Sequence, residues 1–118
     1  MNGPTTLSTA PTIADQPDTV GDRIYLVIGT CCWGRATNAK NALSLARRNY
    51  AASMFQKGYK PAYHLIEVPT GTYVTDDGGF RMPTKDCTYR WVGAFSGTGR
   101  RLPNSTDPFY SSSRSRSV

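Results

Sequence analysis

The residues best suited to covalent or metal chemistry are three cysteines and the single histidine of this 118-residue chain. Cys31 and Cys32 are adjacent, whereas Cys87 and His64 lie far from them in the sequence. Zinc sites commonly use cysteines about two to four residues apart, which lets both thiolates turn toward one ion, while adjacent cysteines point apart. We therefore interpret the cysteines as small buried hydrophobic residues, and expect no metal and no other cofactor.

Catalysis by a side chain is also not indicated. A cysteine near the start of a helix could act as a nucleophile, with His64 as the only imidazole base. The sequence places no acid or amide where it would orient that imidazole. The carboxylates of the central region are few, and two of them belong to a turn sequence before two glycines: Glu67, Asp76, Asp77 and Asp86. We expect that the protein is not an enzyme.

Residues 29–37, GTCCWGRAT, have the layout of a glycine-containing turn from a strand to a helix. Free backbone N–H groups in such a turn can hold an anion. The segment lacks the G-K-[ST] ending of a P-loop and the spacing of G-x-G-x-x-G, so we expect no nucleoside triphosphate site. Two interpretations stay open: a single phosphate contact aided by Arg35, or a purely structural turn with Trp33 packed on the sheet.

The distribution of charge carries more information than the formal net charge of +6. No carboxylate occurs between residues 23 and 66, where the chain has seven cations: Arg23, Arg35, Lys40, Arg47, Arg48, Lys57 and Lys60. A basic surface of this kind is typical of proteins that bind phosphates or an acidic protein. A solvated face without a partner is the structural alternative.

The hydrophobic pattern predicts one helix and several strands. Apolar residues at helical spacing begin after Thr37, which we expect to be the N-cap, and they predict a helix over 38–57. Runs rich in β-branched and aromatic residues predict strands at 23–30, 62–68, 80–83 and 87–95, and an extended segment at 72–75. The order β-α-β-β-β predicts a small α+β domain, with one helix packed on a mainly antiparallel sheet.

The two ends of the chain are poor in apolar residues. We predict a flexible acidic N-terminal tail at 1–21, a folded domain at 22–96 and a flexible Ser/Arg-rich C-terminal tail at 97–118. The ending SSSRSRSV is similar to short phosphorylatable segments of RNA-binding proteins, and a solubilising end is the other interpretation. No apolar run reaches the roughly 18 residues of a membrane span, and no signal peptide is recognisable. With an odd number of cysteines, the sequence indicates the reducing cytoplasm.

These observations favour a small non-catalytic accessory protein that binds RNA or DNA. Phosphate contacts require only fanned cations, and exposed rings of the sheet, drawn from Tyr63, Tyr73, Tyr89 and Trp91, could stack on bases. The residues that we expect to bind are Arg35, Lys40, Arg47, Arg48, Trp33 and Phe55. The alternative is an inhibitor or adaptor of the kind used by phages, viruses and mobile elements. It would dock on an acidic host protein through the helix face that carries Lys40, Arg47, Arg48 and Phe55. A homodimer formed through an open sheet face is compatible with either function.

Overall fold

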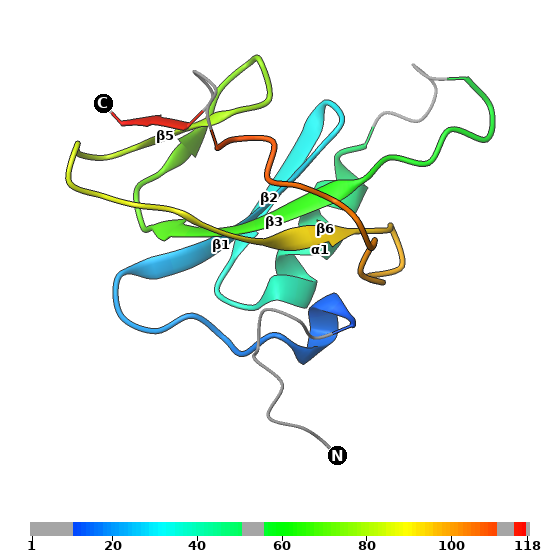
Figure 1. The fold of residues 1–118 in the computed structure, drawn as a ribbon, viewed down its shortest axis with the longest axis horizontal. Coiled ribbons are helices and arrows are strands. Elements are labelled where there is room, and N and C mark those ends of the chain that lie inside the picture. Colours follow the sequence, from blue (N-terminus) through cyan, green and yellow to red (C-terminus); the bar gives the residue numbers. More distant parts are fainter. Residues whose placement is uncertain (1–10, 51–55, 111–114, 118) are drawn as a thin grey trace.

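The structure, a computed structural model, describes residues 11–50, 56–110 and the backbone of 115–117. A four-stranded antiparallel sheet forms the centre, in the order β2-β1-β3-β6 (Figure 1). Its strands are β1 (Arg23–Gly29), β2 (Cys32–Ala36), β3 (Tyr63–Pro69) and β6 (Arg90–Phe95). One helix, α1 (Ala39–Arg48), lies across one face of this sheet (Figure 1). The predicted α+β class is therefore confirmed.

The opposite face of the central sheet is covered by a second, smaller sheet and by the segment that follows β6. The small sheet has the order β4-β5-β7, with β5 and β7 parallel. Its strands are β4 (Tyr73–Val74), β5 (Phe80–Met82) and β7 (Ser115–Ser117). The central sheet is thus buried on both faces, which explains why β1 is a nearly continuous apolar run.

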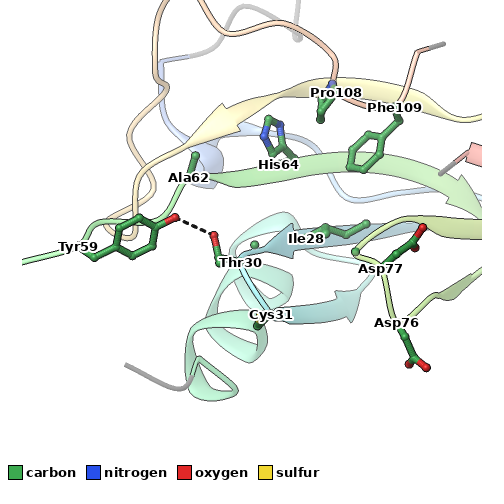
Figure 2. Close-up of a pocket in the computed structure, with 12 residues that line it drawn as sticks. Ile28, Thr30, Cys31, Tyr59, Ala62, His64, Asp76, Asp77, Pro108 and Phe109 are labelled. Carbon is green, nitrogen blue, oxygen red and sulfur yellow. Dashed lines mark hydrogen bonds between the residues drawn. The ribbon is translucent and has the colours of Figure 1, made fainter. Parts of the chain in front are cut away.

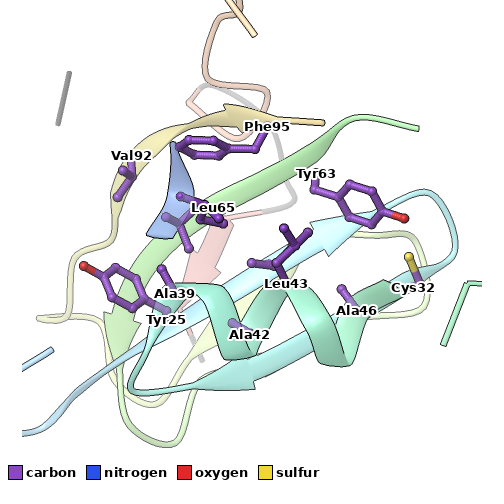
Figure 3. Close-up of a cluster of buried hydrophobic side chains, with 12 residues drawn as sticks. Tyr25, Cys32, Ala39, Ala42, Leu43, Ala46, Tyr63, Leu65, Val92 and Phe95 are labelled. Atoms are coloured by element: carbon purple, nitrogen blue, oxygen red, sulfur yellow. The ribbon is translucent and has the colours of Figure 1, made fainter. Parts of the chain in front are cut away.

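Alternation along the strands divides the core into two clusters. Tyr25 and Val27 of β1 face the helix, whereas Leu26 and Ile28 face the small sheet. The helix-side cluster contains the predicted apolar stripe of α1 and residues of every strand in the central sheet (Figure 3). The other cluster contains Phe80 and Met82 of β5, and also Phe109, which lies after the last strand of the central sheet.

Strand β2 was not predicted, because its residues were interpreted as a turn. It pairs with β1 from Gly29↔Cys32 to Tyr25↔Ala36, so that Thr30 and Cys31 alone form the hairpin loop. Cys31 has a φ of 57°, in the left-handed region that non-glycine residues rarely adopt. The strand is short and contains a glycine, and for this reason its pattern resembled a turn.

The helix ends earlier than predicted, at Arg48 instead of residue 57. Asn49 follows as the C-cap, and its side chain donates a hydrogen bond to the Trp33 carbonyl oxygen at 3.2 Å. Asparagine competes with helical hydrogen bonds in this way, and it favours helix ends. The N-cap is Asn38, which accepts from the Asn41 N–H at 3.0 Å, and not the expected Thr37.

The described parts of both predicted tails, residues 11–21 and 97–110, contribute to the fold. Ile13, in the short 3₁₀ helix η2 (Ile13–Asp15), is only 3% exposed and donates a backbone hydrogen bond to Gly99 at 2.7 Å. After β6, Arg101 pairs with Phe95 and Phe109 is 1% exposed. The boundaries at 21 and 97 therefore divide segments that pack together. No helix in the described ranges is long and apolar enough to cross a membrane.

Candidate functional site

The outer face of α1 presents the cations that the sequence singled out. Lys40, Arg47 and Arg48 are exposed, and Ser44 lies between them as an exposed, short side chain. Positions 40, 44, 47 and 48 share one stripe of a helix, and a rise of about 1.5 Å per residue separates Lys40 from Arg47 by roughly 10 Å. We refer to Lys40, Arg47 and Arg48 as the basic face of α1.

No carboxylate neutralises this face among the residues that the structure describes. The ion pairs of the described residues lie elsewhere: they join Arg23 and Arg90 to a single acid, Glu67, at 3.8 and 3.0 Å. The helix itself contains no acid. Arg47 and Arg48 occupy its last turn, where positive charge complements the helix dipole. The basic face is therefore exposed to solvent without an ion pair to any described residue.

Trp33 and Arg35 do not join the basic face, contrary to the expected arrangement. Cys32 and Gly34 of β2 face the helix, so the alternating residues Trp33 and Arg35 project toward the small sheet. The Arg35 guanidinium lies 5.4 Å from the centre of the Trp33 ring and donates a 2.8 Å hydrogen bond to the Thr72 carbonyl oxygen. Arg35 thus ties β2 to the chain just before β4, on the side of β2 that faces away from the helix.

The other residues that we expected to contact a ligand are Phe55 and the aromatic rings of the sheet. Phe55 lies outside the described residues. Of the rings considered for stacking, Tyr63 is buried against the helix, Tyr89 and Trp91 are partly buried, and Tyr73 is exposed. Exposed Tyr73 belongs to the small sheet, on the opposite side of the central sheet from the basic face.

The cysteines of the hairpin have different environments. Cys31 is exposed at the turn, whereas Cys32 is buried against the helix. Burial raises the pKa of the Cys32 thiol, and neighbouring Cys31 adds to this effect. A raised pKa keeps Cys32 as the thiol, which is a poor nucleophile. In the described ranges, no three His, Cys, Asp or Glu side chains gather in a group that could hold a metal ion.

A cavity of about 460 Å³ lies beside the hairpin turn, on the side away from α1 (Figure 2). It combines segments that are far apart in the sequence: the β1–β2 turn, the start of β3, the turn at 76–78 and the segment at 108–109. A second cavity of about 280 Å³ adjoins it, shares Cys31 and Asp76 in its lining, and extends to Trp33. Sequence spacing gave no indication of this site.

His64 lines the larger cavity, and its hydrogen bonding defines its tautomer. The Trp91 indole N–H donates to Nδ1 of His64 at 3.2 Å. Because an indole nitrogen only donates, Nδ1 carries no proton and Nε2 carries the hydrogen. Burial lowers the pKa of His64, and the carboxylate of Asp107 opposes this effect only in part, so the ring is neutral at pH 7.

This tautomer makes His64 a hydrogen-bond donor to the cavity instead of a base. To accept a proton from Cys31 at Nε2, the ring would have to carry hydrogen on Nδ1, where it would oppose the Trp91 N–H. The Nε2 atom has no hydrogen-bond partner among the described residues. In this tautomer Nε2 of His64 is a hydrogen-bond donor and has no lone pair with which to accept a proton from Cys31.

Comparison with protein-family models, with curated proteins and with solved structures finds no match to this chain.

Proposed function

We propose that this protein binds nucleic acid through phosphate contacts made by the basic face of α1. The observation that carries the proposal is the set of three exposed cations, Lys40, Arg47 and Arg48, on an acid-free helix with no carboxylate partner among the described residues. Cations that are not paired within the protein can release the counterions of a nucleic acid backbone, and this release drives association.

The mode of binding follows from the separation of charge and aromatic rings. Trp33 and Tyr73 are exposed on the other side of the central sheet from α1. A strand lying on the basic face therefore contacts cations without stacking its bases on these rings. Contacts to phosphate position a protein but carry little sequence information, so we expect duplexes to bind and sequence preference to be weak.

The test is a salt series with labelled duplex and single-stranded RNA and DNA, using protein freed of carried-over nucleic acid. Three phosphate contacts on duplex DNA predict a slope of about −2.7 in log K against log salt, or about a 40-fold loss between roughly 50 and 200 mM. Absence of binding at the lowest salt would overturn the proposal. A slope near zero would do the same, because it would place the contacts elsewhere.

Variants then locate the contacts on the helix. We expect Arg47→Glu with Arg48→Glu to weaken binding by about tenfold or more, because two attractions become repulsions. The matched control is Lys60→Glu with Lys85→Glu, which changes the net charge equally at exposed positions away from α1. Arg47→Gln with Arg48→Gln, which avoids acids at the helix C-terminus, should lie between wild type and the Glu variant. Equal weakening by both Glu pairs would show that net charge alone is responsible, contrary to the proposal.

The rival function, docking on an acidic protein of a host, would use the same three side chains. It predicts that the purified protein binds none of the four nucleic acids, and that Arg47→Glu with Arg48→Glu abolishes capture of a single protein partner. The salt series therefore separates the two functions before any partner is known.

A further inference from the structure

The cavity beside the β1–β2 turn combines an apolar interior with polar groups at its edge. Ile28, Ala62, Pro108 and Phe109 supply apolar surface, and Ile28 and Phe109 belong to the buried core (Figure 2). Its volume of about 460 Å³ falls within the range of roughly 300–1,000 Å³ typical of small-molecule sites. The apolar surface would accommodate the hydrocarbon part of a ligand.

The charge of this cavity is opposite to that of the whole protein. Two carboxylates, Asp76 and Asp77, line it, and no lysine or arginine is among the described residues of its lining. The Asp77 carboxylate stabilises the turn to which it belongs, because it accepts hydrogen bonds from the Gly79 N–H at 3.2 Å and from the Thr75 hydroxyl. Asp76 is exposed and has no hydrogen bond or ion pair among the described residues, so its carboxylate, which points outward in Figure 2, is free to turn toward a ligand.

The other polar groups do not offset this negative charge. Neutral His64 contributes an N–H donor, and the hydroxyl groups of Thr30 and Tyr59 lie 3.2 Å apart at the edge (Figure 2). Among the described residues of the lining, an anion would meet two carboxylates and no countercharge, which disfavours phosphates and carboxylic acids as ligands. A cationic group beside Asp76 would be attracted.

We infer that this cavity binds a small organic cation with an apolar body, of the arylalkylamine class. The aryl group lies on Ile28 and Phe109, and the ammonium group lies toward Asp76. This site is on the opposite side of the central sheet from the basic face of α1, and its ligand has the opposite charge. The inference is therefore independent of the proposed nucleic acid contacts.

Three probes of nearly the same shape and different charge test the inference: phenethylamine, 2-phenylethanol and phenylacetate. Each is titrated into ¹⁵N-labelled full-length protein at pH 7, and amide chemical shifts are followed. We expect phenethylamine to bind and to shift the amides of Thr30, Cys31 and Gly78. We expect 2-phenylethanol to bind more weakly and phenylacetate not to bind. Equal affinity for phenethylamine and phenylacetate would overturn the inference, as would shifts confined to other surfaces.

Two variants localise the site. Asp76→Asn should weaken phenethylamine by about three- to fivefold, the range expected for an exposed charge pair, and should leave 2-phenylethanol unchanged. Asp86→Asn is the matched control, since Asp86 is exposed and lines neither cavity. Ala62→Leu adds side-chain volume inside the cavity, and it should weaken the binding of both phenethylamine and 2-phenylethanol.

The outcomes of these variants are decisive in either direction. An Asp76→Asn protein that binds phenethylamine as wild type does would overturn the role of this carboxylate.

An arginine- or lysine-containing peptide is titrated in parallel. Binding of the peptide without binding of any small amine would overturn the small-molecule assignment in favour of a protein ligand.

Discussion

At the scale of single residues, His64 shows how a tertiary contact determines chemistry. From sequence it was the only imidazole able to serve as a base. The indole of Trp91 occupies its Nδ1 atom, and this bond leaves an N–H group facing the cavity. One hydrogen bond from a residue that lies 27 positions away thus changes a candidate base into a donor.

The lowered pKa of His64 predicts a pH dependence of stability. Below its ordinary pKa of 6.5, the unfolded chain binds a proton that the folded chain still excludes. The free energy of unfolding should therefore decrease as the pH falls from about 7.5 to 5.5. It should be greatest at pH values above the ordinary histidine pKa of 6.5. Because the chain contains one histidine, this window reports on His64. Urea denaturation at several pH values measures the effect.

His64→Gln is the control for this pH dependence. Glutamine can still accept a hydrogen bond from Trp91, but it does not titrate. We expect the variant to lose the slope between pH 7.5 and 5.5, whatever its absolute stability. A slope that persists in His64→Gln would assign the effect to other groups.

At the scale of elements, the contact between β2 and α1 depends on the absence of a side chain. A Cβ atom at Gly34 would lie 2.3 Å from the Ala42 carbonyl oxygen and 2.5 Å from the Ala46 nitrogen. Both atoms belong to the helix backbone, which cannot move aside by changing a rotamer. The alanines of α1 and the glycine of β2 together let the helix approach the edge of the sheet, and the approach positions the basic face outward.

We therefore expect Gly34→Ala to destabilise the fold by about 3 kcal/mol and lower the melting temperature by on the order of 10 °C. Gly97→Ala is the control, because its Cβ would have ordinary contacts of 3.7 and 3.9 Å, and it should change stability by less than about 0.5 kcal/mol. Thermal unfolding followed by circular dichroism compares the two variants. Similar melting temperatures would show that the helix can shift away from β2.

At the scale of the whole molecule, the described N- and C-terminal segments complete the two sides of the core. Ile13 closes the helix-side cluster next to Gly99. Phe109 closes the other cluster, where its ring lies 5.2 Å from Phe80 and 5.9 Å from His64. The same Phe109 forms part of the cavity, so the segment after β6 contributes to both stability and the proposed ligand site.

The predicted domain boundaries can be tested directly. A chain restricted to residues 22–96 lacks Ile13 and Phe109, and we expect it not to give a cooperative unfolding transition. In the full chain, Phe109→Ala alone should cost about 3–5 kcal/mol, the usual value for a buried phenylalanine. Near-ultraviolet circular dichroism and urea denaturation measure both proteins. A cooperative 22–96 fragment would show that the terminal segments are dispensable.

The sequence by itself determined the elements whose hydrophobic period is long and regular. The apolar run of β1, the alternation of β3 and the stripe of Ala39, Ala42, Leu43 and Ala46 were all recognisable, and they led to the α+β class. The cations of α1 were recognisable for the same reason, because residues opposite an apolar stripe face solvent.

Only the tertiary structure decided what depends on pairing over long distances. The short strand β2 exists because β1 supplies its hydrogen bonds, and this pairing moved Trp33 and Arg35 away from the basic face. A register shift at Leu65/Ile66 places Trp91 and Phe95 of β6 in different clusters, although strict alternation predicts the same face. The cavity is assembled from four separate segments. Local periodicity indicates which side chains are buried. The residues that pack against them are distant in the sequence, so only the folded structure shows which residues these are.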